Sequence, residues 1–326
     1  MILAGDVGGT KTRLTVFDPG AGMSIAREAT LPSPELESLE SAVEAFLLGA
    51  QRLKVDRGCV GVAGPVIDGR CVATNLPWVV DERRVAAAAG APVTLINDLE
   101  AAAHGVLTLP AEKFLVLQAG APKPGGNVAL IAAGTGLGQA LIVPEGQAYR
   151  VVPSEGGHAD FAPADELQID LLRFLRAELG HVSWERILSG PGLANTYRFL
   201  HARAGHAAPE WLRARLQRED PGAVIGEVGL AGRDPVCGEA LDLFVSIYGA
   251  QAGNLALETL ALGGLVVGGG IAPKIKAKLA AGGFMAAFRA KGRLKSLLAS
   301  MPVRVALEAR AGLLGAAHVA SRLRAS

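Results

Sequence analysis

The sequence predicts an α/β protein of two related domains with a cleft between them. Strand-like and helix-like segments alternate along the 326 residues, a length that supports two domains with ample core. A glycine hairpin between two apolar strands opens the chain, within "GDVGGTKTRLTVFD" at residues 5–18. A second one follows in "NVALIAAGTGLGQALIVPEG" at residues 127–146. The repeated opening therefore favours two domains of the same kind, which commonly hold a ligand between them.

The elements expected between the two hairpins alternate in type. Leu39, Val43, Phe46 and Leu47 have helical spacing, and Gly90 ends a short helix. The buried strand before Asp98 is followed directly by a helix. Helices are expected at residues 36–50, 81–90 and 99–109, and strands at residues 57–75 and 92–98.

The second part of the chain repeats this pattern with longer helices. It begins with a strand before the second hairpin and ends with an apolar strand that runs into three glycines. Strands are expected at residues 114–120 and 264–270, and helices at residues 165–179, 190–205 and 236–262.

Composition excludes several classes of protein. Half of the residues are hydrophobic, 19% are charged and the formal net charge is +1, so charge gives no general attraction to nucleic acid or acidic lipid. The basic stretch at residues 274–295 is interpreted as a solvated helix face. No apolar stretch is long enough to span a bilayer and no signal peptide is expected, so a cytoplasmic protein is predicted. Three scattered cysteines, Cys59, Cys71 and Cys237, predict no zinc site.

Both hairpin tips have the composition of phosphate-binding loops. Backbone N–H groups at such a tip form a concavity for anions. Asp6 precedes the first tip and could hold Mg²⁺, whereas Thr10 and Lys11 follow it as donors for phosphate. The second tip carries Gly134, Thr135 and Gly136. It is not a Walker A loop, because no Gly-Lys-Ser/Thr closes it, and not a dinucleotide fingerprint, because the glycine spacing is wrong and a strand follows it. A tight turn and nothing more is the alternative.

A third glycine segment, "GGLVVGGGIAPKI" at residues 263–275, ends a strand in Gly268, Gly269 and Gly270. Pro273 could start a helix after it. An ordinary strand-to-helix turn is one interpretation. Together with the two hairpins, an adenosine site is the other.

Four polar residues are candidates for work on a substrate. Asp98 follows a buried strand, at the end where ligands bind in α/β sheets, and is either a catalytic base or a helix cap. Glu155 and His158 bracket Gly-Gly, which can turn both side chains to one ligand. Glu185 lies before a helical stretch, where an exposed first-turn acid is the alternative.

The chain resembles the bacterial glucokinase family, within the sugar kinase and actin superfamily. The resemblance runs from end to end and departs at Gln139, where the family usually has a small apolar residue. It is carried by "GDVGGTKTRL", "TNLPW", "INDLEAAAHG", "AAGTGLG", "SEGGHADFAP", "WERILSGPGLANTYR" and "GGLVVGGGIAP".

This resemblance implies the two-domain actin-like ATPase (ribonuclease H-like) fold with a central cleft. It implies a small domain of residues 1–109 plus 304–326 and a large domain of residues 110–303. The terminal segment at residues 303–323 is expected to fold back on the first domain as a strand and a helix. A homodimer is implied as well.

The implied activity is Mg²⁺- and ATP-dependent phosphorylation of the glucose 6-hydroxyl. Asp98 is then the general base, Asn97 holds a neighbouring hydroxyl, and the other sugar ligands are Asn75, Glu155, His158 and Glu185. The implied nucleotide-binding residues are Asp6, Gly8, Gly9, Thr10, Lys11, Gly134, Thr135, Gly136, Gly268, Gly269 and Gly270, with Asp6 on the metal. The alternatives are a kinase for another hexose or an N-acetylated amino sugar, and a sugar-sensing regulator that transfers nothing.

Overall fold

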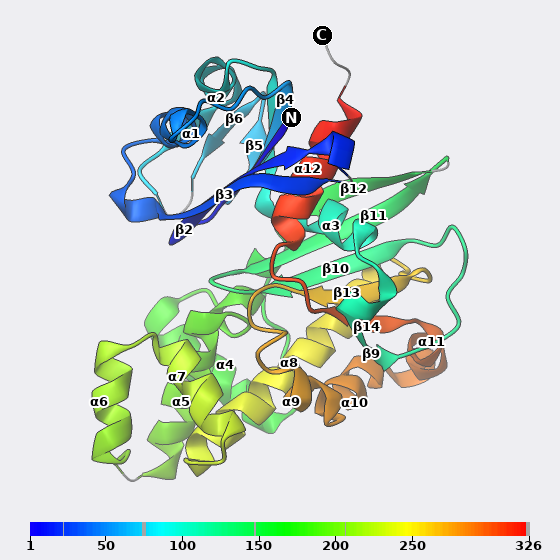
Figure 1. The fold of residues 1–326 in the computed structure, drawn as a ribbon. Helices are drawn as coiled ribbons and strands as arrows, with labels where there is room; N and C mark the ends of the chain where they lie inside the picture. Colours follow the sequence, from blue (N-terminus) through cyan, green and yellow to red (C-terminus); the bar gives the residue numbers. More distant parts are fainter. Residues whose placement is uncertain (22, 74–75, 147, 206, 324–326) are drawn as a thin grey trace. The chain divides into compact units, whose positions relative to one another are not determined.

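The computed structural model describes residues 1–21, 23–73, 76–146, 148–205 and 207–323. The chain divides into two compact units, each built on its own mixed sheet (Figure 1). Unit 1 comprises Met1–Ala111 and Glu308–Ser326, and unit 2 comprises Glu112–Leu307. Among the described residues, no helix has the length and apolar character needed to cross a membrane.

Unit 1 is organised around a five-stranded sheet in the order β3-β2-β1-β4-β8. The first three strands form an antiparallel meander, and β4 and β8 continue the sheet in parallel with β1. Their bounds are β1 Ile2–Val7, β2 Lys11–Asp18, β3 Ser24–Pro32, β4 Arg57–Val62 and β8 Val93–Asn97. A small antiparallel sheet contains β5 Val66–Ile67, β6 Arg70–Val72 and β7 Val79–Asp81.

Helices cover both faces of the unit 1 sheet. Successive strand residues point to opposite faces, so Leu3 and Val60 belong to one core while Ala4 and Cys59 belong to the other. The first core includes α1, and α12 packs in the second against β1, β4 and α3. The helices are α1 Leu39–Leu48, α2 Glu82–Ala89, α3 Asp98–Thr108 and α12 Ala311–Arg322.

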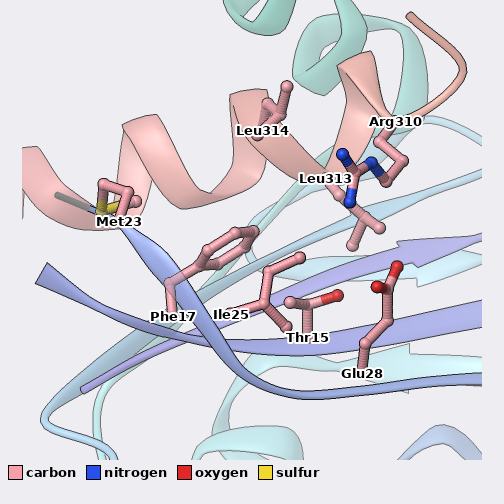
Figure 2. Close-up of a pocket in the computed structure, with 8 residues that line it drawn as sticks. All are labelled: Thr15, Phe17, Met23, Ile25, Glu28, Arg310, Leu313 and Leu314. Carbon is pink, nitrogen blue, oxygen red and sulfur yellow. The ribbon is translucent and has the colours of Figure 1, made fainter. Parts of the chain in front are cut away.

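A cavity of about 120 Å³ lies where α12 meets β2 and β3 (Figure 2). Phe17 and Leu313 form apolar walls, and Glu28 and Arg310 stand at its polar end. Pockets for nucleotides and drug-sized ligands usually exceed about 300 Å³. The cavity is therefore too small to be the nucleotide site predicted from the sequence.

Unit 2 contains a six-stranded sheet in the order β12-β11-β10-β13-β14-β9. The first five strands in this order repeat the arrangement of the unit 1 sheet. They form an antiparallel meander of β12, β11 and β10, followed by β13 and β14 parallel to β10. This shared order confirms the internal repeat that the two glycine hairpins indicate. The bounds are β9 Phe114–Gln118, β10 Val128–Ala133, β11 Leu137–Glu145, β12 Ala148–Ser154, β13 Gly264–Gly268 and β14 Val303–Ala306.

One large apolar core holds unit 2 together. Its centre is the long helix α8, whose residues are apolar on nearly all sides and which buries Phe244 and Tyr248 completely. A helix that is hydrophobic all round needs neighbours on all sides, and α5, α7 and α10 pack against it. The helices are α4 Glu166–Leu179, α5 Gly190–Ala204, α6 Glu210–Arg218, α7 Pro221–Leu230, α8 Pro235–Glu258, α9 Lys276–Ala280, α10 Gly283–Arg289 and α11 Lys295–Ser300.

Two expectations from the sequence are wrong. The strand beginning at Val303 does not fold onto the first domain, because β14 pairs with β13 and β9 inside unit 2, and only α12 belongs to unit 1. Pro273 does not start a helix: Lys274 and Ile275 both donate backbone hydrogen bonds to Ile271 O in a series of turns. The helix α9 begins at Lys276.

Candidate functional site

In unit 1, the first hairpin tip and Asp98 lie at the same edge of the sheet. Val7 at the end of β1 pairs with Val62 on β4, and Val62 pairs with Asn97 at the end of β8. The carboxyl ends of these parallel strands therefore coincide, and that edge is where α/β sheets bind ligands. The register alone brings together two groups of candidates that are far apart in the sequence.

The first tip, Gly8–Lys11, is braced by a residue that the sequence did not indicate. Ser33, fully buried in the turn Ser33–Glu35 after β3, donates its backbone N–H to Thr10 O at 3.1 Å and its hydroxyl to Gly8 O at 2.7 Å. A Cβ on Gly8 would come no closer than 3.6 Å, to Lys11 O. The chain itself thus leaves room for a side chain at Gly8, and the bare backbone suits a ligand.

Asp6 carries a half-buried carboxylate near this tip. Burial raises the pKa of the Asp6 carboxyl, an effect that the Arg13 guanidinium on β2 opposes. Among the described residues, no hydrogen bond or ion pair to this carboxylate is found within unit 1 or elsewhere. A half-buried carboxylate without such a partner in the described chain fits a divalent cation, since Mg²⁺ is bound through one or two carboxylates together with phosphates and water.

Asn97, rather than Asp98, caps helix α3. Its Oδ1 accepts from Leu99 N at 2.9 Å and from Glu100 N at 3.3 Å, while its Nδ2 donates to Gly64 O at 2.9 Å. Asp98 Oδ1 also accepts from Leu99 N at 2.9 Å, but Asn97 occupies the cap position, so capping does not account for an acid at position 98. Asp98 is the first residue of the helix. Burial raises the pKa of the nearby Cys71 thiol, and the charge of Asp98 raises it further.

In unit 2, the second tip, Gly134–Gly136, is fixed at both of its ends. Gly134 N donates to Gly136 O at 2.8 Å, and Gly190 N, at the start of α5, donates to Gly134 O at 2.9 Å. The buried hydroxyl of Tyr248 accepts from Ala133 N at 3.1 Å, just before the tip. The tip thus meets the N-terminal end of a 15-residue helix, whose dipole favours anions.

Glu185 joins the second tip to the sugar-binding candidates. Its Oε2 accepts the backbone N–H of Leu137 at 2.9 Å and lies 4.0 Å from His158 Nε2. A Cβ on Gly136 would lie 2.5 Å from the same oxygen. One carboxylate therefore contacts the end of the phosphate tip and faces His158.

Backbone pairing brings Glu185 and His158 together. Asp160 forms an isolated bridge with Ser183, and Trp184 N donates to Ala159 O at 3.0 Å. The turn Gly156–His158 is thereby held beside the turn Trp184–Arg186. The exposed side chain of Glu155 stands at the start of the first turn, so three of the predicted sugar ligands come from two adjoining turns.

The third glycine segment lies next to the second tip. Gly268 pairs with Ala132 on β10, and Ile271 N donates to Ala133 O at 3.2 Å. Gly269 has a φ of +81° and no room for a Cβ, which would lie 2.3 Å from Ala133 O. Gly268 is crowded by Leu130 at 3.1 Å, so the fold itself explains these two glycines.

Two glycines remain that the chain does not explain. A Cβ on Gly134 or on Gly270 would meet nothing within 4 Å, and neither residue has the positive φ that favours glycine. Open space beside a bare backbone at the carboxyl ends of β10 and β13 suits a bound group. Asn75, a further candidate from the sequence, lies outside the described residues.

The structure brings the candidates together in two sets. Unit 1 contains Asp6, Gly8, Gly9, Thr10, Lys11, Asn97 and Asp98, and unit 2 contains Gly134, Thr135, Gly136, Glu155, His158, Glu185, Gly268, Gly269 and Gly270. Within the described part of the chain, no group of three or more His, Cys, Asp and Glu side chains could together hold a metal ion. The three cysteines are free and buried.

Known proteins resemble the chain along its whole length. A protein-family model described as glucokinase matches residues 3–323. The glucokinase of Nostoc sp. is 41% identical over 340 residues, covering 99% of both chains. The crystal structure of a glucokinase from an Antarctic psychrotroph superposes with a TM-score of 0.81 at 33% identity, again covering 99% of both chains. A ROK family glucokinase from Streptomyces griseus, solved in complex with glucose and AMPPNP, shares the fold with a TM-score of 0.67 at 24% identity, covering 99% of both chains. The chain therefore belongs to the glucokinase family and has its two-domain actin-like ATPase fold.

Proposed function

We propose that this hexose kinase of the glucokinase family transfers the terminal phosphoryl group of ATP to the 6-hydroxyl of glucose, giving glucose 6-phosphate and ADP. The observation that carries the proposal is the position of Glu185, whose carboxylate accepts from Leu137 N at the phosphate tip and faces His158 in the sugar set. The glucose and AMPPNP complex of the Streptomyces griseus relative supports the same pair of ligands.

Asp98 is proposed as the general base. Phosphoryl transfer to a sugar hydroxyl depends on positioning, charge neutralisation and a group that accepts the hydroxyl proton. Asp98 lies at the ligand-binding edge of its sheet, and the N-cap of α3 is Asn97 rather than Asp98. Asn97 retains one amide N–H for a sugar hydroxyl beside the one bonded to Gly64 O.

Glu155, His158 and Glu185 are proposed to bind the remaining sugar hydroxyls. Carboxylates accept strong hydrogen bonds from hydroxyl groups, and imidazole can donate or accept. Because these residues come from two turns that are paired through the backbone, they form one surface for the sugar ring.

The two tips are proposed to hold the phosphates of ATP, and Gly268–Gly270 its adenosine. Gly134 and Gly270 leave open space at adjoining strand ends. Asp6 would hold Mg²⁺, which neutralises phosphate charge when bound. The position of Asp6 fits that role, because burial raises the pKa of its carboxyl although the Arg13 guanidinium opposes the shift, and a divalent cation would add further positive charge.

A coupled assay across sugars and phosphoryl donors tests the proposed function. We expect glucose with ATP to give the highest kcat/KM. Other hexoses and N-acetylated amino sugars form the substrate controls, and ADP and polyphosphate form the donor controls. A higher kcat/KM for an N-acetylated amino sugar, or turnover only with another donor, would overturn the assignment.

Replacing Glu185 by glutamine is expected to weaken glucose binding. The amide can still accept from Leu137 N, but it loses the charge that strengthens hydrogen bonds from sugar hydroxyls. A hydrogen bond to a charged group contributes roughly 1.5–3 kcal/mol, so the KM for glucose should rise about 10- to 100-fold. Steady-state kinetics with glucose varied at saturating ATP measure this. An unchanged KM would remove Glu185 from the sugar site.

Activity is expected to be independent of zinc. The described residues offer no cluster of ligands for zinc. The three cysteines are buried, and they are scattered along the sequence. Elemental analysis of purified protein should find no stoichiometric zinc, and activity should return after EDTA treatment once excess Mg²⁺ is supplied. Tightly held zinc whose removal abolishes activity would contradict this expectation.

A cytoplasmic homodimer is proposed as the working form. The proposal rests on family membership rather than on a particular contact. Light scattering of the purified chain should give twice the monomer mass of 33.5 kDa, and a monomer at assay concentration would be evidence against it.

A further inference from the structure

Gln139 on β11 is a buried amide whose nitrogen has no hydrogen-bond partner. The residue is 2% exposed, and among the described residues its Nε2 is one of few buried side-chain polar atoms without a partner. Such a group costs stability, because the donor loses its water and gains nothing in return. Each such group in a native structure therefore calls for an explanation.

Another buried glutamine in the same sheet shows what a purely structural role looks like. Gln118 on β9 donates from Nε2 to Leu298 O at 2.8 Å and to Met301 O at 2.5 Å, and its Oε1 accepts from Arg289 Nε at 2.6 Å. Every polar atom of that amide is used to join neighbouring segments. Gln139 differs, since its donor bonds to no part of the described chain.

The amide of Gln139 packs directly against the turn that carries Glu155 and His158. Gln139 pairs across the sheet with Ser154, whose Oγ accepts from Gly156 N at 3.0 Å. The Oε1 of Gln139 lies 2.7 Å from the point that a Cβ on Gly156 would occupy. A side chain at position 156 would force this amide to move, so Gly156 and Gln139 are packed closely against each other.

The strand before Gln139 holds the other sugar ligand. Leu137, two residues earlier on the same face of β11, donates its N–H to Glu185 Oε2, and its carbonyl lies 1.9 Å from a Cβ built on Gly157. The segment from Leu137 to Gln139 thus contacts both turns of the proposed sugar site. The side chain of Gln139 therefore lies against Gly156, in the turn between Glu155 and His158.

We propose that Gln139 is a positioning residue for sugar binding: its Nε2 donates to an oxygen of the Glu155–His158 turn when that turn binds the sugar. The inference rests on the proposed function, because it takes Glu155 and His158 as sugar ligands. The unpaired donor lowers the stability of the free protein, and in return it improves the placement of the sugar site. Such a trade-off is common at functional sites.

Gln139→Met and Gln118→Met form a matched pair that tests the proposal. Methionine has nearly the volume of glutamine and no amide. Gln139→Met should keep or raise Tm, because the unpaired donor is removed. The KM for glucose should rise about 3- to 10-fold, the effect of losing one hydrogen bond. Both kcat and the KM for ATP should stay within about twofold of wild type. Gln118→Met should lower Tm and leave the KM for glucose unchanged.

A second variant keeps the shape of the side chain. Gln139→Glu places a carboxyl group where the amide stands, and this group donates only while it is protonated. The KM for glucose of this variant should rise with pH relative to wild type, a dependence that a structural role would not produce. It also serves if Gln139→Met fails to fold.

An unchanged KM for glucose in folded Gln139→Met, or a flat pH profile in Gln139→Glu, would overturn the proposal. The Glu185→Gln variant separates this failure from failure of the site. If Glu185→Gln raises the KM for glucose and Gln139→Met does not, the sugar site stands and the role of Gln139 is wrong. If neither variant does, the proposed sugar site is wrong, and the inference fails with it.

Discussion

Replacing Asp98 by asparagine is expected to lower kcat by about 10²- to 10⁴-fold, the usual contribution of general base catalysis. Asparagine keeps the shape and can still accept from Leu99 N as the carboxylate does at 2.9 Å, but it cannot take the proton of a sugar hydroxyl. Helix α3 should persist, because its cap is Asn97. Rapid-mixing or steady-state kinetics at saturating substrates measure the loss.

Two measurements separate catalysis by Asp98 from binding. Calorimetry should show ATP binding near that of wild type, and the affinity for glucose should change only modestly. Asn97→Ala is the neighbouring comparison: it removes the helix cap, at a cost of about 1 kcal/mol of stability, and the proposed amide contact to the sugar, so it should weaken glucose binding while leaving the carboxylate. If Asp98→Asn retains most of its kcat, the base lies elsewhere and the interpretation of the segment "IND" is wrong.

The second large effect is expected at the tip Gly134–Gly136. A Cβ on Gly134 meets nothing within 4 Å, so Gly134→Val should fold normally and place its side chain in the space proposed for phosphate. The KM for ATP should rise at least about 10-fold, the order of one lost charge-assisted hydrogen bond. The KM for glucose should stay near wild type. Steady-state kinetics with each substrate varied in turn measure both values.

Gly136→Val should behave differently from Gly134→Val. Its Cβ would lie 2.5 Å from Glu185 Oε2, so Glu185 must move and release Leu137 N. The KM for ATP and the KM for glucose should therefore both rise. A well-folded Gly136→Val protein with wild-type ATP kinetics would remove this tip from the nucleotide site. Equal effects of the two variants on glucose would contradict the proposed link through Glu185.

Local sequence signals predicted the local structure well. Glycines between apolar strands predicted the two hairpins. The strand that follows "GTGLG" excluded a dinucleotide-binding loop, which must be followed by a helix. Helical spacing located α1, and a glycine marked the end of α2 at Gly90, which has a φ of +67°. These features depend on residues that are close in the sequence.

Long-range pairing was not predictable in the same way. The apolar run at Val303 has the pattern of a buried strand, but nothing within it specifies pairing with β13 rather than with the sheet of unit 1. Parallel pairing joins residues that are distant in the sequence, so the run carries no local mark of its partner.

Supporting residues of the candidate site were missed for the same reason. Ser33 and Tyr248 fix the roots of the two tips through hydrogen bonds that span long stretches of chain, and neither lies in a motif. The sequence could not decide whether Asp98 is a cap, because Asp and Asn are equally good caps and the two residues are adjacent. Only the hydrogen bonds of Asn97 resolve the choice.

The central claim, that the chain transfers a phosphoryl group to sugar, is tested most directly by measuring ADP with each substrate present alone and with both together. We predict that ADP forms in equal amount with glucose 6-phosphate when ATP, Mg²⁺ and glucose are all present, and that little ADP forms when glucose is left out. Glucose binding without any ADP, the behaviour of a sugar-sensing regulator, would contradict the account.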